Sequence, residues 1–396
     1  MNNIKSKLFR LFIRSINYLF PKNKHKVMFA SEPDFSDNAR ALYDYIITQE
    51  KFKKFTFIWL VKDNIIKGDF PHTIFVKRGD SCLSFCYFHY LFHLFTSKYL
   101  FCTHSHFVEA NPKRQISVCL WHGTMLKRIC AMNEREKKQP RKDQFRFFIA
   151  PSHFYLEYFC KSFLCNSNNV LICGYPRNDY LFQDSDILNK LNIEKEKNKL
   201  IVYMPTFRKP LCGDYSDSED NSLNFIEPEN EKSLQELSNF LSQKGITLII
   251  KWHPSDSRQD ISIKYPNIVS LTNKDIFNSG FQTYHLLHYA DALITDYSSV
   301  FCDFIMLDRP IAFTISDIES YSKKRGFVFD NPLEFLPGYI LQNNKDFVNF
   351  INDIAKCIDQ SVEKRRNLYH LYNDFNDNHS SERLLDIISH LSKEMY

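Results

Sequence analysis

Residues 116–124 read ISVCLWHGT, an apolar and β-branched run that ends on Trp121, His122, Gly123 and Thr124. The run predicts a buried strand at 116–121, and the glycine that follows predicts a tight turn. Similar short runs alternate with helical patterns on both sides of this stretch. Such alternation is typical of a parallel sheet with helices on both faces, so the sequence predicts an α/β fold.

The alternation forms two series, separated by a polar, Lys/Glu-rich stretch at 184–199 that predicts a linker. Strands of the first series are expected at 26–31, 55–61, 73–77, 98–103, 116–121, 146–150 and 169–173, with helices at 38–49, 81–96 and 153–164. Strands of the second are expected at 200–205, 247–252, 267–271, 291–295 and 310–315, and the chain is helical from about 345. Two doubly wound domains in tandem imply a cleft, since ligands of such sheets bind outside the carboxyl ends of the strands.

Composition sets limits on the class of protein. The chain has 396 residues, enough for about two domains, and 44% of them are hydrophobic. A net charge of +5 over this length gives no argument for nucleic-acid binding, so no nucleic acid is expected. The 11 cysteines are odd in number and form no C-x-x-C pair, which predicts reduced, buried thiols.

The first 21 residues predict a basic amphipathic helix that ends at Pro21, with no secretory signal evident. One side carries Leu8, Phe9, Phe12, Ile13, Ile16, Leu19 and Phe20, and the other carries Lys5, Lys7, Arg10, Arg14 and Asn17. This pattern fits a helix lying on an anionic membrane surface, and it equally fits a helix packed on its own domain. The expected domains are therefore a membrane-associating segment at 1–24, a first Rossmann-like domain at 25–185 and a second at 199–396.

Polar clusters directly follow five of the expected strands, which predicts that they converge on one site. In the first cluster, Gly123 permits a turn, Thr124 can cap a helix that favours a phosphate, and neutral His122 can take a proton near pH 7. A structural histidine at a turn explains His122 equally well. In the second cluster, Arg177 and Asp179 lie in GYPRND, either at the site or in an ordinary capped turn.

The other three clusters belong to the second series. Thr206 and Arg208 lie in PTFR, where a fixed cation suits a pyrophosphate. His253 and Pro254 end the strand of KWHP, where a donor nitrogen could neutralise phosphate charge and where a capped core histidine fits equally well. The last cluster offers hydroxyl and backbone N–H groups at an expected helix start near 298, which suits an anion and equally suits simple capping; its members are Thr295, Asp296, Ser298, Ser299 and Asp303.

Metal use is not expected. The acidic runs at 184–186 and 217–220 lie in the expected linker and a loop, away from the strand ends where a cleft would hold Mg²⁺. His104 and His106 follow a strand, but the sequence offers them no third ligand.

Taken together, the clusters resemble the CDP-glycerol glycerophosphotransferase family, which includes teichoic-acid primases and polymerases and related capsule enzymes. The resemblance rests on WHGTMLKRI at 121–129, GYPRND at 174–179, MPTFR at 204–208, IIKWHP at 249–254 and ADALITDYSSVFCDF at 290–304. Weaker matches lie at 36–46 and 321–338. Met125 and Phe207 stand where the family more often has Pro and Trp.

This resemblance implies a GT-B-like fold of two facing Rossmann-like domains. No cofactor is expected. The resemblance also implies that a lipid-linked acceptor hydroxyl attacks the β-phosphorus of a CDP-polyol at the cytoplasmic face of the membrane, and that CMP leaves. His122 would be the base, and His253 and Arg208 would carry the pyrophosphate charge. The expected substrate contacts are Gly123, Thr124, Arg177, Asp179, Thr206, Pro254, Thr295, Asp296, Ser298, Ser299 and Asp303. The alternatives are a GT-B glycosyltransferase with a nucleotide-sugar donor and a non-catalytic membrane-surface scaffold.

Overall fold

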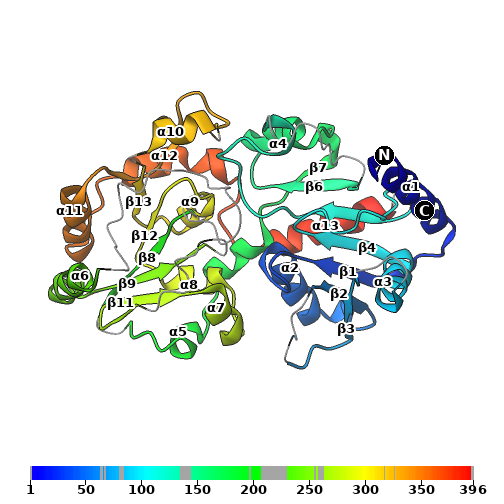
Figure 1. Cartoon of the computed structure of the whole chain (residues 1–396), viewed down its shortest axis with the longest axis horizontal. Coiled ribbons are helices and arrows are strands. Elements are labelled where there is room, and N and C mark those ends of the chain that lie inside the picture. The colour runs from blue at the N-terminus through cyan, green and yellow to red at the C-terminus, as the bar shows by residue number, and fades with distance from the viewer. Residues whose placement is uncertain are drawn as a thin grey trace. The chain divides into compact units, whose positions relative to one another are not determined.

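The computed structural model of the protein divides into two compact units (Figure 1). The structure describes residues 2–62, 66, 68–79, 84–133, 144–195, 198–206, 230–253, 256, 263–315, 317–324 and 326–393. Unit 1 comprises Met1–His122, Cys130–Asp179 and Asp377–Tyr396, and unit 2 comprises Gly123–Ile129 and Tyr180–Asn376. This division differs from the expected domains. The N-terminal segment belongs to unit 1, unit 2 begins at Tyr180 and includes the expected linker, residues 123–129 belong to unit 2, and residues 377–396 belong to unit 1.

Unit 1 is built on a seven-stranded sheet in the order β3-β2-β1-β4-β5-β6-β7, and all of its neighbouring strands are parallel. The first six strands have the order of a Rossmann sheet, which reverses direction between β1 and β4. Ligands of such sheets bind beside that reversal, at the carboxyl ends of the strands. The strands are β1 (Asn23–Ala30), β2 (Thr56–Val61), β3 (Thr73–Lys77), β4 (Ser97–Cys102), β5 (Ile116–Cys119), β6 (Phe147–Ala150) and β7 (Val170–Ile172).

Helices cover both faces of this sheet, as right-handed crossovers between parallel strands require (Figure 1). They are α1 (Asn2–Leu19), α2 (Asp37–Thr48), α3 (Phe85–Thr96), α4 (Leu156–Phe163) and α13 (Ser380–Lys393). Short 3-10 turns lie at Glu50–Phe52, Cys130–Met132, His153–Tyr155 and Ser167–Asn169, and a longer one runs over Pro176–Phe182. Helix α13 belongs to this unit because it packs against α2 and begins on a cap supplied by Asp179.

Unit 2 repeats the same plan with the strand order β10-β11-β9-β8-β12-β13-β14. All pairs are parallel except the short β10–β11 pair. The strands β11-β9-β8-β12-β13-β14 again have the Rossmann order, with the reversal between β8 and β12. Their bounds are β8 (Lys199–Met204), β9 (Ile246–Lys251), β10 (Lys264–Tyr265), β11 (Ile268–Leu271), β12 (Ala292–Thr295), β13 (Ile311–Thr314) and β14 (Tyr339–Leu341).

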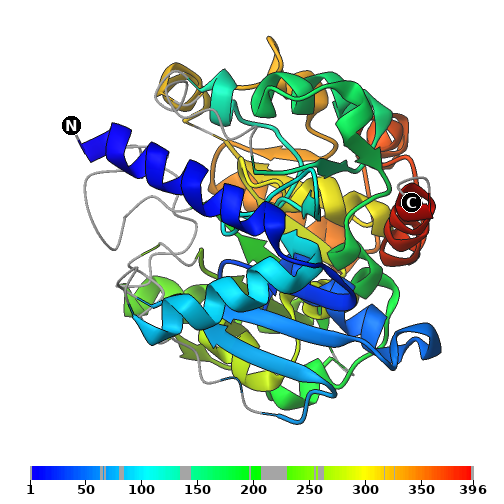
Figure 2. The ribbon, with the colours of Figure 1, turned by 90° about the vertical axis from the view of Figure 1, so that its right-hand side faces the viewer.

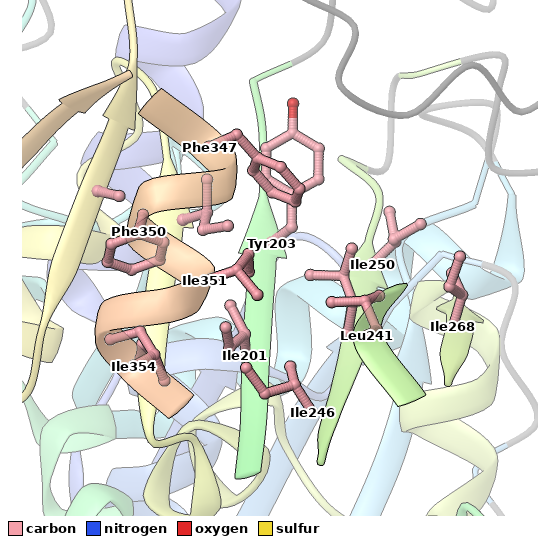
Figure 3. Close-up of a cluster of buried hydrophobic side chains, with 14 of the residues drawn as sticks. Ile201, Tyr203, Leu241, Ile246, Ile250, Ile268, Phe347, Phe350, Ile351 and Ile354 are labelled. Atoms are coloured by element: carbon pink, nitrogen blue, oxygen red, sulfur yellow. The ribbon is translucent and has the colours of Figure 1, made fainter. Parts of the chain in front are cut away.

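The core of unit 2 lies between its sheet and two amphipathic helices (Figure 3). Phe350 and Ile351 of α11 and Leu241 of α6 are fully buried in one cluster with Ile201 of β8 and Ile246 of β9. The helices of the unit are α5 (Ile187–Lys190), α6 (Glu231–Gln243), α7 (Asn273–Ser279), α8 (Thr283–Tyr289), α9 (Val300–Phe304), α10 (Ile318–Lys324), α11 (Asn344–Ala355) and α12 (Val362–Tyr372). 3-10 turns lie at Ile305–Leu307 and Pro332–Phe335.

The expected α/β fold of two doubly wound units is confirmed, and every expected strand lies within a few residues of an observed one. The N-terminal segment is helical, as α1. The expected loop that carries the acidic run at 217–220 lies outside the described residues. None of the helices in the described ranges combines the length and the apolar character needed to cross a bilayer.

Candidate active site

His122 follows β5 in a turn with unusual backbone geometry. Trp121 has a positive φ of 49°, and Gly123 has a φ of 138°, a conformation that favours glycine. The Nδ1 atom of half-buried His122 faces the carbonyl oxygen of Thr103 at 3.4 Å. Because a carbonyl can only accept, this contact favours the neutral tautomer with its proton on Nδ1 and with Nε2 as the basic nitrogen.

Asn38 and Arg177 hold the carbonyl groups of this turn. The Asn38 side chain, which is fully buried, donates to the carbonyl oxygens of Leu120 and Trp121 at 3.0 Å each. Arg177 donates through Nη1 to the carbonyl oxygen of His122 at 3.0 Å. Three successive carbonyl groups are therefore fixed by side chains, which determines the direction in which the His122 ring leaves the chain.

Arg177 is itself fixed on unit 1. Its guanidinium forms an ion pair with Asp37 Oδ1 at 2.9 Å, and its side chain is only 7% exposed. Its backbone N–H donates to Asn38 Oδ1 at 3.1 Å. These contacts support the site-organising interpretation of GYPRND; a direct contact of Arg177 with substrate stays a prediction.

We expect Arg177→Lys to lower the turnover number about tenfold to a hundredfold, because one ammonium cannot hold both Asp37 and the His122 carbonyl with the geometry of a guanidinium. The KM for the donor should stay nearly unchanged. Steady-state kinetics measure this effect, and the conservative variant Arg40→Lys, at a half-exposed Arg–Asp pair on α2, serves as the control. Unchanged turnover in Arg177→Lys would show that the contacts of Arg177 with Asp37 and with the His122 carbonyl group are dispensable.

Asp179 caps α13. Its two carboxyl oxygens accept from the N–H groups of Ser380 and Ser381 at 2.8 and 2.9 Å, which satisfies two N–H groups of that helix terminus. Burial raises the pKa of Asp179, and the hydrogen bonds from both serines act in the opposite direction. A Cβ at Gly174 would lie 2.6 Å from Ser380 Oγ, so glycine there permits the close approach of α13. The contacts of Asp179 within the described chain are structural, and its role toward substrate stays a prediction.

The expectation that Thr124 caps a helix is wrong. Thr124 is buried, no helix follows it, and residues 126–128 instead run antiparallel to residues 326–328 within unit 2. Arg128 N–H donates to Gly326 O at 3.1 Å, and Val328 N–H donates to Leu126 O at 3.0 Å. This pairing occupies the backbone that a helix would have needed.

In unit 2, Thr206 and Asp296 meet at the reversal point of the sheet, where β8 and β12 end side by side. The Thr206 N–H donates to both carboxyl oxygens of Asp296, at 3.0 and 2.9 Å, and its hydroxyl donates to Oδ2 at 2.8 Å. Asp296 is fully buried and Thr206 is 4% exposed. This contact fixes the point from which the chain leaves β8 toward residue 207.

The remaining residues of the Thr295–Asp303 cluster differ in their surroundings. Thr295 donates its hydroxyl to Met204 O at 2.7 Å, and the hydroxyl of Tyr284 donates to Asp303 Oδ2 at 2.5 Å, so both side chains stabilise the unit. Ser298 and Ser299 are half-buried, and Ser299 makes no side-chain cap on α9. The two serines are therefore the members best placed to reach a ligand.

Lys251 lies beneath the turn that carries His253. Its ammonium donates to Trp252 O at 3.1 Å and also contacts Asn273 Oδ1. Burial lowers the pKa of Lys251 from 10.5 to about 8, and the nearby Asp275 opposes this shift. Sequence reasoning assigned roles to His253 and Pro254 of this motif and missed the buried lysine.

This depressed pKa makes stability depend on pH. Between pH 8 and 10.5 the unfolded chain holds the Lys251 proton and the folded chain releases it, so the free energy of unfolding rises as the pH rises through that interval. From about pH 7 to about pH 9.5 the wild type should gain about 1–2 kcal/mol relative to Lys251→Met. Urea denaturation at both pH values measures this, with Lys274→Met, at an exposed position on α7, as the control. Parallel pH dependences of wild type and Lys251→Met would contradict the shift.

Two expected site residues, Arg208 and Pro254, lie outside the described residues. Within unit 1 the structure brings His122 and Arg177 together, and within unit 2 it brings Thr206, Thr295 and Asp296 together. Sequence reasoning missed Asn38 as a member of the site. Its signal was present in SDNARALYDYI at 36–46, a stretch that the family resemblance included only as a weak match.

Two sheets of Rossmann order, each with polar residues at the carboxyl ends of its strands, define a GT-B-like protein. The family model of CDP-Glycerol:Poly(glycerophosphate) glycerophosphotransferase matches residues 12–390. The chain therefore belongs to this family, and it is an enzyme of the glycerophosphotransferase type.

Relatives and solved structures agree with this membership. A teichoic acid ribitol-phosphate primase of Bacillus spizizenii is 25% identical, with 98% of this chain and 97% of that protein covered. A teichoic acid glycerol-phosphate primase of Bacillus subtilis is 28% identical, with 90% of each covered. The structure of the wall teichoic acid polymerase TagF superposes with a TM-score of 0.76 at 22% identity, over 100% of this chain and 98% of that one, which shows the shared fold.

Proposed function

We propose that the protein transfers glycerol phosphate, or a related polyol phosphate, from a CDP-polyol to a hydroxyl group of a lipid-linked precursor, and that CMP is released. The surface polymer would be a teichoic acid, with a capsule polymer as the other candidate. The observation that carries this proposal is the fixed turn of His122, whose ring orientation leaves Nε2 as the basic nitrogen. A histidine held in this way suits the removal of a proton from an acceptor hydroxyl.

The reaction is a displacement at phosphorus. The acceptor oxygen bonds to the β-phosphorus as its proton passes to His122, and the bond from that phosphorus to the oxygen of CMP breaks. His253 and Arg208 would neutralise the negative charge that develops on the phosphates, without a metal ion. In the described ranges, no group of three or more His, Cys, Asp or Glu side chains is arranged to hold a metal.

Unit 2 would bind the donor. The reversal point between β8 and β12 favours this, because open α/β sheets bind nucleotides there. Ser298 and Ser299 would contact the nucleotide diphosphate, Asp296 would hold Thr206 in place, and Pro254 would shape the turn beside His253. Gly123 and Thr124 would contribute to the same donor site. Thr295 and Asp303 would contribute indirectly, because their hydrogen bonds stabilise the backbone around that site.

A panel of donors tests the activity. Purified protein with a membrane extract is incubated with CDP-glycerol, CDP-ribitol or UDP-sugars, and the lipid-linked products are analysed by mass spectrometry. A mass increase of one or more polyol phosphates from a CDP-polyol is expected. Addition of a sugar from a UDP-sugar would instead support the glycosyltransferase alternative, and no product from any CDP-polyol would support the scaffold.

Helix α1 supports membrane docking, because it lies on unit 1 through Arg14, Asn17 and the buried Ile13 while most of its apolar side chains stay exposed. Asn17 donates to Glu109 O and Gln115 Oε1 at 2.9 Å each, and Arg14 Nε donates to Val108 O at 3.0 Å. Apolar side chains of the same helix are exposed instead: Leu8 61%, Phe9 44%, Leu11 50%, Phe12 62% and Leu19 78%. A helix packed on its own domain would bury these side chains, so this orientation favours the interfacial interpretation.

Helix α3 extends the exposed apolar surface. Phe85, Phe88 and Phe92 are 83%, 55% and 56% exposed, and they follow one another at helical spacing. The end of α1 adjoins α3, since Phe20 contacts Phe95 with ring centroids 5.2 Å apart, and both helices can be followed in Figure 2. With the basic residues of the N-terminus, this surface suits the anionic, cytoplasmic face of the cell membrane, where a lipid-linked acceptor would be reached.

We expect Leu8→Ser combined with Phe12→Ser to reduce partitioning onto phosphatidylglycerol-containing vesicles at least about tenfold, since two large apolar side chains would no longer enter the lipid. Vesicle sedimentation measures the effect. Leu333→Ser, which removes a 42% exposed leucine from unit 2, is the matched control and should bind as the wild type does. Undiminished binding of the double variant would rule out α1 as the membrane contact.

A further inference from the structure

His104 lies flat against His122. The two rings are stacked with their centroids 4.2 Å apart and their planes within 4° of parallel. Neighbouring parallel strands place them together, since β4 ends at Cys102 beside Cys119 at the end of β5. His104 thus lies one residue beyond Thr103, at the reversal point of the unit 1 sheet.

Thr103 links the two rings. Its hydroxyl is 2.9 Å from His104 Nδ1, and its carbonyl oxygen faces His122 Nδ1. The same hydroxyl accepts from the backbone N–H of Glu32 at 3.3 Å. Thr103 follows β4 and Glu32 follows β1, so the two strands that flank the reversal both hold the pair of imidazole rings in place. Neither ring can turn without breaking a contact to Thr103.

One carboxyl group, that of Glu32, interacts with His104; it also forms an ion pair with Lys62 at 2.7 Å. Burial would raise the pKa of Glu32, yet Lys62 and the imidazoles of His104 and His106 lower it, so this carboxyl group interacts favourably with a charged His104. His122 instead has the guanidinium of Arg177 at its own carbonyl group. Within the described ranges, the titratable and charged groups around the pair include Glu32, Asp37, Lys62, Arg78, His106 and Arg177.

We propose that His104 is a positioning residue that fixes the His122 ring by stacking and keeps it neutral by taking up the proton that the pair can share. Two parallel imidazoles this close repel each other when both are charged, so the pair holds one proton far more readily than two. Of the two rings, His104 is the one that interacts with the carboxyl group of Glu32. His122 then stays a base to lower pH than it would alone. This inference rests on the proposed role of His122 as the base.

The pH profile of turnover distinguishes this role from a structural one. His104→Phe keeps a flat ring without a charge. The acidic limb of its turnover profile should therefore move to higher pH by about one unit, while the KM for the donor is unchanged. His104→Ala should show the same shift and also lose about tenfold in the plateau, because the stack is gone. His25→Phe, at an exposed position near the amino end of β1, should match the wild type. An acidic limb of His104→Phe that overlays the wild type would overturn the proposal.

A second measurement needs no activity. The titration of the His122 ring is followed by NMR in the free protein, with the signal assigned from His122→Gln. In His104→Phe its midpoint should move upward as the acidic limb does, and an unmoved midpoint would refute the pairing. Should the wild type transfer nothing from any CDP-polyol while the midpoint does move, the proposed function fails and the coupling of the two rings stands.

Discussion

His122→Ala is expected to lower the turnover number about a hundredfold or more, which is the scale of a lost general base. The KM for the CDP-polyol should change little, because this side chain acts on the acceptor hydroxyl. The turn should survive, since Asn38 and Arg177 hold backbone carbonyl groups that alanine retains. Steady-state kinetics over the full range of donor concentration separate the two parameters.

The control is His25→Ala, which removes an exposed histidine of β1 at the opposite end of the strand from the candidate site. It should leave both kinetic parameters unchanged. Turnover of His122→Ala within about threefold of the wild type would reject the base assignment, because general bases contribute far more than this.

Asp296→Ala is the second change with a large expected effect. It leaves the N–H and hydroxyl of Thr206, both buried, without the acceptor that they share. The free energy of unfolding should fall by about 1–3 kcal/mol, and the KM for the donor should rise about tenfold or more as the end of β8 shifts. Urea denaturation and kinetics on the same preparation measure the two effects.

Thr206→Ser keeps the N–H and the hydroxyl and is the matched control, expected to resemble the wild type in both measurements. An Asp296→Ala protein that is destabilised but binds the donor with normal KM would show that this contact serves only the fold.

The strand pattern made the fold predictable because parallel strands buried on both faces are continuous apolar runs. The strand expected at 73–77 is the observed β3 (Thr73–Lys77). The order of the strands sets the two reversal points. Polar residues lie at the ends of the strands there, as the sequence predicted. Thr206 and Asp296 are the clearest case, since each follows a strand beside the reversal in unit 2.

Other features depend on contacts far apart in the sequence. No local signal at 377–396 indicates that α13 returns to unit 1, because Asp179, which caps it, lies about two hundred residues earlier. Thr124 looked like a helix cap, but pairing with residues 326–328 prevents a helix there. The amphipathic pattern of α1 was clear, while the side that faces unit 1 is formed by Asn17 and Arg14 together with Ile13, and not by the larger apolar residues.

The identity of the released nucleotide tests the central claim most directly. Attack of an acceptor hydroxyl on the β-phosphorus of CDP-glycerol leaves CMP, whereas transfer of the polyol alone, as a glycosyltransferase transfers a sugar, leaves CDP. Phosphorus NMR of the reaction of wild-type protein with CDP-glycerol and acceptor distinguishes the two. We predict that CMP accumulates in step with acceptor modification, and that His122→Ala forms it at least about a hundredfold more slowly. Accumulation of CDP, or CMP formation at the wild-type rate in His122→Ala, would contradict the account.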